Sequence, residues 1–150
     1  MGSIIMAIMI YVPNFTSMDA ISPLTFPELD STNTYAKTHL MELRHGAVIV
    51  ADIQTAGRGQ KGHFWHSDTR GNVYASLIIK PSHATPKDLP VLTQMLAQVI
   101  IATLKDYGVT ADIKWPNDVM VGGKKIAGIL AESVSQGMKV SGVIMGFGVN

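Results

Sequence analysis

The sequence predicts an α+β domain built on a mixed, largely antiparallel sheet. Several short runs rich in Val and Ile follow one another at close spacing, which is typical of neighbouring strands. One long stretch, residues 88–108, carries apolar residues at helical spacing. Of the 150 residues, 47% are hydrophobic and only 15% are charged, so the chain can bury a substantial core.

Charge and cysteine content exclude several classes of protein. The 12 Lys and Arg residues nearly balance the 11 Asp and Glu residues, so binding to nucleic acid through net charge alone is disfavoured. The lack of Cys excludes disulfide scaffolds, thiolate metal sites and cysteine nucleophiles. The apolar run at residues 4–12 is shorter than the roughly 20 residues that cross a bilayer, so we expect no membrane partner.

The first half of the chain predicts a lead-in segment, a short helix, a strand and a loop. Residues 1–23 form the N-terminal lead-in, whose apolar run suits a strand or a segment docked on the core. The polar residues 30–33 offer several N-caps for a helix over residues 34–43. Residues 47–53 are typical of a buried strand, and residues 54–67, with three glycines, are typical of a loop.

The second half predicts another strand, the long helix and a series of hairpins. Residues 72–80 are rich in Val, Leu and Ile, and Pro81 closes this strand. Pro90 suits the first turn of the long helix, and Gly108 suits its end. Four further strands are predicted, separated by turns at 116–118, 122–123 and 136–137: residues 112–115, 119–121, 126–134 and 139–145.

The glycine-rich loop superficially resembles a dinucleotide-binding motif. Gly57, Gly59 and Gly62 have the spacing G-x-G-x-x-G, which binds dinucleotides only where a helix follows immediately. Phe64 and Trp65 follow instead, and they do not open a helix. We therefore reject a Rossmann fold for this chain.

The same loop still has features that suit an anionic ligand. Its glycines let backbone N–H groups approach a phosphate closely, and Arg58 and Lys61 can neutralise phosphate charge. Trp65 can cover an apolar ring or a base. An exposed, solvated hairpin loop would explain the same residues about equally well.

A second motif, Lys-Trp-Pro-Asn-Asp, occupies residues 114–118. Pro116 forces the residue before it into an extended conformation, which places Lys114 at the end of a strand. An ammonium group held there suits a phosphate or a carboxylate under attack, although a surface lysine on an edge strand is the simpler reading. Asn117 and Asp118 could bind Mg²⁺, but a turn explains them without a metal.

Two further motifs are weak by themselves. Helix capping alone explains Ser31, Thr32 and Asn33. Near the end of the chain, the glycines in residues 146–149 could admit the ring of a ligand, and Asn150 could hydrogen-bond the edge of a base.

In this order, the four motifs closely resemble the catalytic domain of biotin protein ligases, within the biotin/lipoate ligase family. The resemblance covers residues 24–150, and the Lys-Trp-Pro-Asn-Asp string is its most specific part. It implies a mixed sheet with helices packed on one face. It also implies an enzyme that joins biotin to ATP, releases pyrophosphate, and passes biotin from biotinyl-5′-AMP to a lysine of a carboxylase carrier protein or carrier domain.

The resemblance also implies a role for each site residue. Lys114 and Arg58 would be catalytic, because they lower the repulsion between the biotin carboxylate and the α-phosphate. Nine residues would hold biotin: Ser31, Thr32, Asn33, Gln54, Gly57, Arg58, Gly59, Lys114 and Gly128. Seven would bind the nucleotide: Arg58, Gly59, Lys61, Trp65, Lys114, Asn117 and Asn150. Mg²⁺ would accompany ATP, with ligands that the sequence does not assign.

The chain departs from the family pattern at two places. Gln60 stands where many members carry a second arginine, so we expect the retention of the adenylate to differ. The chain stops at Asn150 directly after a strand-like run, so we expect the catalytic domain to be incomplete at its C-terminal end. We also expect no DNA-binding role, because little chain precedes Leu24.

The location, the oligomeric state and two alternative functions complete the expectations. ATP use and the lack of a targeting signal predict a cytoplasmic protein. The resemblance implies a homodimer. A lipoate–protein ligase shares the fold and the adenylation chemistry, and a non-catalytic fragment that binds biotin or a nucleotide is the alternative from another class.

Overall fold

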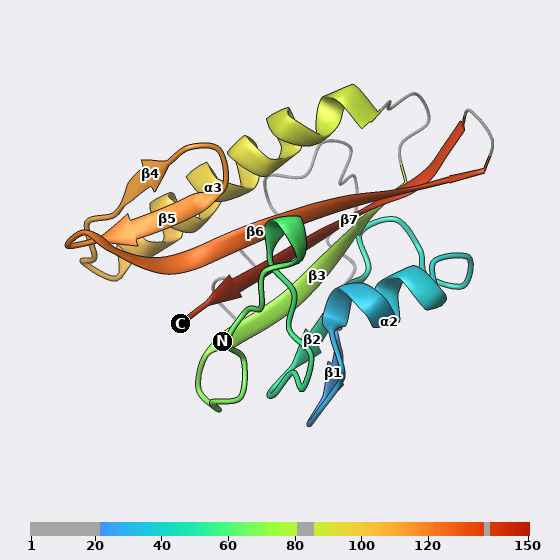
Figure 1. Cartoon of the computed structure of the whole chain (residues 1–150), viewed down its shortest axis with the longest axis horizontal. Helices are drawn as coiled ribbons and strands as arrows, with labels where there is room; N and C mark the ends of the chain where they lie inside the picture. The colour runs from blue at the N-terminus through green and yellow to red at the C-terminus, as the bar shows by residue number, and fades with distance from the viewer. Residues whose placement is uncertain (1–21, 81–85, 137–138) are drawn as a thin grey trace.

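A computed structural model describes residues 22–80, 86–136 and 139–150. Its centre is a seven-stranded sheet in the order β1-β2-β3-β7-β6-β5-β4 (Figure 1). β1 and β2 are parallel, and the other neighbouring pairs are antiparallel, so the predicted mixed, largely antiparallel sheet is confirmed. The strands are Leu24–Phe26, Val48–Ala51, Val73–Ile79, Asp112–Lys114, Asp118–Val121, Lys124–Gln136 and Lys139–Val149.

The central strands are buried on both faces because their sequences are apolar at consecutive positions. All residues of β2 are buried, and in β3 only the last residue is partly exposed. Strands of this kind need a cover on each side of the sheet. Two helices supply it: α2, Thr32–Thr38, and α3, Leu89–Asp106.

The two helices cover opposite faces, so the expectation that helices pack on one face is wrong. Val48 and Val50 of β2 point into a core with the α3 residue Ile100. Ile49, between them in sequence, points into a second core with the α2 residue Leu40. Because side chains alternate along a strand, the sheet separates the two cores. Figure 1 shows the strands running between the two helices.

In the first half, α2 is displaced from its predicted position and β1 was not predicted. Ser31 is the N-cap, and its hydroxyl accepts a hydrogen bond from the N–H of Thr34, so the helix begins earlier than residue 34. It also ends earlier than residue 43. β1 has an exposed, weakly apolar pattern and forms by pairing with β2, where Leu24 lies opposite Ile49.

In the second half, most predicted elements are confirmed. α3 ends before Gly108, whose φ of 76° suits glycine. Gly122 and Gly123 have φ values of 55° and 76° and form the tight turn between β5 and β6. The predicted lead-in strand at residues 4–12 and the turn at Gly137 lie outside the described residues.

Candidate ligand-binding cleft

Glycines clear a space on the sheet face that α2 covers. Gly128 of β6 pairs with Gly148 of β7, and the pair Leu130–Gly146 follows on the same face. A Cβ atom at Gly148 would collide with the indole of Trp65. A side chain at these positions would therefore displace the groups that the glycine loop and α2 bring to the sheet.

The space left by these glycines is a cleft. About 420 Å³ of space within it is unfilled by protein atoms, and part of that space is open to solvent. The N-terminus of α2, the loop at residues 54–65, and strands β6 and β7 form its walls. The lining residues are Ser31, Thr32, Asn33, Gln54, Arg58, Gly59, Gln60, Trp65, Asn117, Lys125, Gly128, Ile129, Leu130, Gly146, Phe147 and Gly148.

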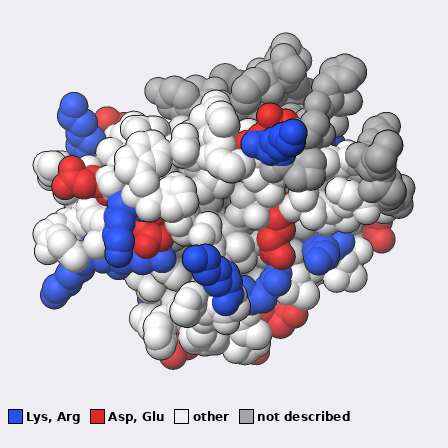
Figure 2. Space-filling model, turned by 45° about the horizontal axis from the view of Figure 1, so that its top comes forward, with Lys and Arg blue, Asp and Glu red and all other residues white. Residues whose placement is uncertain are grey.

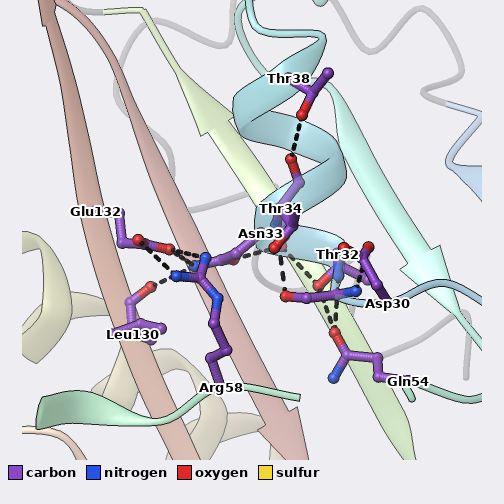
Figure 3. A network of polar contacts seen from close by, with 11 residues as sticks. Asp30, Thr32, Asn33, Thr34, Thr38, Gln54, Arg58, Leu130 and Glu132 are labelled. Atoms are coloured by element: carbon purple, nitrogen blue, oxygen red, sulfur yellow. Dashed lines mark hydrogen bonds and ion pairs between the residues drawn. The ribbon is translucent and has the colours of Figure 1, made fainter. Parts of the chain in front are cut away.

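The floor of the cleft is a buried network of polar side chains (Figure 3). The backbone N–H of Thr32 donates to Gln54 Oε1 at 2.8 Å. Ser76 Oγ donates to Asn33 Oδ1 at 2.6 Å and lies 2.8 Å from Thr32 Oγ1. These bonds hold the start of α2 against β3 and present a polar surface to a ligand, since buried polar groups persist where they are hydrogen-bonded.

Glu132 of β6 joins this floor to the glycine loop. Its carboxylate accepts a hydrogen bond from Asn33 Nδ2 at 2.8 Å. It also accepts hydrogen bonds from both terminal nitrogens of the Arg58 guanidinium, from Nη2 at 2.8 Å and from Nη1 at 3.3 Å. Figure 3 shows Arg58 rising from the loop toward this carboxylate. The cation of the loop is therefore held at the edge of the cleft by an acid on the sheet.

Trp65 also lines the cleft, beside a second cation. Its indole packs over Gly128 and Gly148, and Lys125 Nζ lies 5.0 Å from its ring centroid. Lys125 Nζ is also 2.7 Å from Asp118 Oδ1, an ion pair by distance, although the geometry is not that of a hydrogen bond. The indole N–H is buried, with no partner among the residues described. It is a donor that an acceptor on a ligand could satisfy.

Both cations in the cleft are thus paired with acids, and the charges elsewhere are mixed. Arg58 pairs with Glu132 and Lys125 with Asp118. On the face in Figure 2, basic and acidic side chains are interspersed, so that face carries no broad field of one sign. The chemistry of the cleft therefore depends on these two local pairs.

Most of the predicted site residues lie together in this cleft. Nine line it: Ser31, Thr32, Asn33, Gln54, Arg58, Gly59, Trp65, Asn117 and Gly128. Gly57 lies behind the lining, where a Cβ atom would meet Ser67 Oγ and the Trp65 carbonyl. Lys61 is exposed in a short 3-10 turn, Gln60–Gly62, and Asn150 Nδ2 donates to the carbonyl of His66.

Lys114 is exposed and stands beside the cleft rather than in its lining. The strand register nevertheless places Lys114 on the same face of the sheet as Gly128, which lines the cleft. Lys114 pairs with Asp118, which pairs with Gly128. Residues paired in this way share one face of the sheet. Lys114 and Gly128 are two strands apart, which corresponds to about 10 Å between their backbones. The Lys114 ammonium can therefore extend toward the cleft from its rim.

The sequence prediction of the site omitted Glu132, Ser76 and Lys125. Glu132 is separated from Arg58 by 74 residues and from Asn33 by 99, so no local pattern could connect them. Ser76 lies within an apolar strand. Lys125 belongs to the predicted Gly-Gly hairpin, and only the register of β5 and β6 places it over Trp65.

Neither a metal centre nor a membrane-spanning helix is found in the described ranges. Over residues 22–80, 86–136 and 139–150, no three His, Asp or Glu side chains are grouped so as to hold a metal ion. Within the same ranges, neither helix has the length and apolar character needed to span a bilayer.

Comparison with known proteins shows to which family the chain is similar. Residues 25–150 match the family described as biotin/lipoate A/B protein ligases. The bifunctional ligase/repressor BirA of Bacillus subtilis is 42% identical over 106 residues, covering 70% of this chain and 32% of that protein. A biotin--[acetyl-CoA-carboxylase] ligase of Paracoccus denitrificans is 34% identical over 123 residues, covering 81% and 51%.

Solved structures show the same fold. The biotin protein ligase of Aquifex aeolicus in complex with biotin and ATP superposes with a TM-score of 0.70 at 30% identity, covering 86% of this chain and 52% of that one. The biotin acetyl coenzyme A carboxylase synthetase of Helicobacter pylori gives a TM-score of 0.68, also at 30% identity, covering 84% and 59%. The chain spans about a third to a half of the length of the curated relatives cited above.

Proposed function

The chain belongs to the biotin/lipoate A/B protein ligase family, and from that premise we propose that it carries the active site of an ATP-dependent biotin–protein ligase. The reaction forms biotinyl-5′-AMP and then transfers biotin to a lysine of a carboxylase carrier domain. The observation that carries this proposal is the cleft itself, in which a buried polar floor meets the arginine of a glycine loop and a tryptophan wall.

The relatives support biotin rather than lipoate as the substrate. Several similar proteins are named biotin ligases, and the Aquifex aeolicus structure holds biotin and ATP. In this chain, Ser31, Thr32, Asn33 and Gln54 offer hydrogen-bonding groups for the polar ring system of biotin. No specific observation on the cleft favours lipoate.

The first step brings two anions together. A carboxylate oxygen of biotin attacks the α-phosphorus of ATP, the bond from that phosphorus to the bridging oxygen breaks, and pyrophosphate leaves. Arg58 and Lys114 lower the repulsion and stabilise the charge that grows at phosphorus. Lys125, which lines the cleft, adds a third cation beside Trp65. Trp65 stacks on the adenine, and Asn150 hydrogen-bonds its edge.

The second step consumes the mixed anhydride. A neutral lysine amine of the carrier attacks the acyl carbon, the bond to the AMP oxygen breaks, AMP leaves, and the amine loses a proton. Water would attack the same carbon, so the loop at residues 54–65 has to exclude it until the carrier arrives. Glycines in that loop allow its backbone to pass close to the ligand.

The described residues do not build a cage for Mg²⁺. The Asp118 carboxylate, which the sequence offered as a possible Mg²⁺ ligand, is paired with Lys125. Mg²⁺ is therefore proposed to enter as the ATP complex, held mainly by phosphates, as is usual for this ion. A biotin carboxyl carrier protein or carrier domain is the proposed partner. A homodimer, a cytoplasmic location and the lack of a DNA-binding role remain predictions.

A thermal-shift series tests the function. The chain is melted with biotin, with Mg-ATP, with both, and with lipoate in place of biotin. A ligand at about 100 times its Kd adds about 2.7 kcal/mol, enough to raise Tm by several degrees. We expect biotin with Mg-ATP to raise Tm more than either alone, together with biotin-dependent release of pyrophosphate.

Each other outcome selects an alternative. A shift with biotin alone and no pyrophosphate indicates a binding fragment without catalysis. A larger shift with lipoate and Mg-ATP indicates a lipoate ligase. No response to biotin under any condition contradicts the proposal for this chain.

A further inference from the structure

Glu132 lies where Asn33 of the cleft floor and Arg58 of the glycine loop meet. Its carboxylate lies 2.8 Å from Asn33 Nδ2 and 2.8 Å from Arg58 Nη2. Asn33 in turn accepts from Ser76 Oγ at 2.6 Å. A continuous chain of hydrogen bonds therefore runs from β3, through the start of α2 and β6, to the cation of the loop.

The tip of the loop has few polar links to the sheet. Gly59 N–H donates to the His63 carbonyl at 2.7 Å, and Trp65 N–H donates to the Gly57 carbonyl at 2.9 Å, so these bonds stay within the loop. Across to β6, the described structure shows two contacts from residues 57–65 that involve a charge: the hydrogen-bonded Arg58–Glu132 pair, and the Lys125 ammonium over the ring of Trp65. Among these contacts, Glu132 is the one that hydrogen-bonds the loop to that strand.

The pairing leaves part of the guanidinium free. Arginine carries five N–H donors in a rigid fork, and one from each terminal nitrogen points to the Glu132 carboxylate. Three donors remain for another anion. Because the guanidinium is planar, a carboxylate hydrogen-bonded to one of its edges also fixes the direction of the remaining N–H donors.

We propose that Glu132 is a positioning residue of the cleft, which holds Arg58 over the bound anion and links it to Asn33 in the floor. This inference rests on the proposed ligase function for what the anion is. Glu132 itself does not contact the reacting atoms, because its carboxylate would repel the anionic groups that react. Glu132 acts through Arg58.

Exposure argues for a role in positioning rather than in stability. The side chains of Arg58 and Glu132 are 42% and 21% exposed. A pair this open to solvent contributes little to folding. Its geometry still restricts the loop, and a misplacement of about 1 Å at a reacting group can cost up to about a hundredfold in rate.

The test uses Glu132→Gln, which keeps the shape and can still accept from Asn33 but loses the charge. Asp52→Asn is the matched control, because Asp52 pairs with Arg70 at 3.2 Å outside the cleft. The first readout is amide hydrogen exchange over residues 57–65 without ligand. We expect these amides to exchange about fivefold faster in Glu132→Gln and at an unchanged rate in Asp52→Asn. Added salt should speed exchange in the parent chain and in Asp52→Asn, where the Arg58–Glu132 pair is intact, but not in Glu132→Gln.

The second readout is the release rate of labelled biotinyl-5′-AMP. We expect Glu132→Gln to speed release about tenfold in the wild-type background and to add nothing to Arg58→Ala, because the effect passes through Arg58. Unchanged exchange and release in Glu132→Gln would overturn the inference. An equal effect in both backgrounds would also overturn it.

The two proposals fail separately. If the wild-type chain makes no adenylate while exchange responds to Glu132→Gln as expected, the ligase function fails and the anchoring of Arg58 by Glu132 stands. If adenylate forms but neither readout responds, the inference fails and the function stands.

Discussion

Arg58 and Gln60 lie two residues apart, and both line the cleft, yet they differ in what they can hold. Arg58 carries a full charge and is oriented by Glu132. Gln60 is neutral and begins the short 3-10 turn at the tip of the loop. At the scale of the residue, the retention of an anionic intermediate should therefore depend on the first of these side chains.

We expect Arg58→Ala to speed the release of biotinyl-5′-AMP by about tenfold or more, because a charge-assisted hydrogen bond to an anion is worth roughly 1.5–3 kcal/mol. Gln60→Ala should change release by less than about threefold. Single-turnover release of the labelled adenylate measures both variants. Equal effects would mean that the cation of the loop does not hold the phosphate.

Gly146 and Gly142 lie on the same face of β7, and substituting each of them tests how the floor of the cleft is held. A Cβ atom at Gly146 would strike the Asn33 side chain, which is bonded to Ser76. Breaking that buried bond should cost about 1–3 kcal/mol. At Gly142 the added atom meets the branched end of Leu40, which can rotate, so Gly142→Ala should cost less than about 1 kcal/mol.

Urea unfolding measures the two glycine variants. Biotin titration should also show weaker binding in Gly146→Ala, since Asn33 moves, and unchanged binding in Gly142→Ala. If both variants lose the same stability and the same affinity, the packing of Asn33 against Gly146 does not organise the floor.

At the scale of the element, α3 supports the sheet from the side opposite the cleft. Ile100 is fully buried in the core between α3 and the sheet, whereas Val91 on the same helix is 56% exposed. The helix therefore contributes stability and no lining residue to the cleft.

We expect Ile100→Ala to lower the free energy of unfolding by about 2–5 kcal/mol, because it leaves a cavity in the core. Val91→Ala should change it by no more than about 0.5 kcal/mol. Urea titration gives both values. Below the unfolding transition, the biotin affinity of Ile100→Ala should equal that of the parent chain. A tenfold weaker affinity would show that α3 shapes the cleft through the sheet.

At the scale of the whole molecule, the sheet separates two cores. Ile100 belongs to the core under α3, and Ile144 belongs to the core under α2. Both are fully buried. Since β7 contributes alternate residues to each core, loss of either core should unfold the whole sheet in one transition.

Ile100→Val and Ile144→Val should each cost about 0.5–1.5 kcal/mol. In the double variant the costs should add to within about 0.5 kcal/mol, because residues without shared partners behave independently. Thermal or urea unfolding of the parent, the single variants and the double variant measures the sum. An interaction energy above about 1 kcal/mol, or two separate transitions, would contradict this account of the cores.

Features that depend on neighbouring residues could be predicted from local sequence patterns. Runs of Val and Ile predict the central strands, the apolar repeat up to Gly108 predicts α3, and the Gly122–Gly123 pair predicts a hairpin. Nine of the predicted site residues also lie in one cleft, and the signal that pointed to them was the order of the four motifs, which resembles that of biotin protein ligases. Local spacing is enough for these features, since strands, helices and turns each have their own period.

Which distant segments meet depends on how the whole chain packs. The tertiary structure paired β1 with β2, put the helices on opposite faces, and brought Glu132 to Arg58 and Asn33 across 74 and 99 residues. It also placed Lys125 in the cleft and Lys114 at its rim. The reason is that strand order and register follow from the burial of both sheet faces together, a global condition that no local pattern contains.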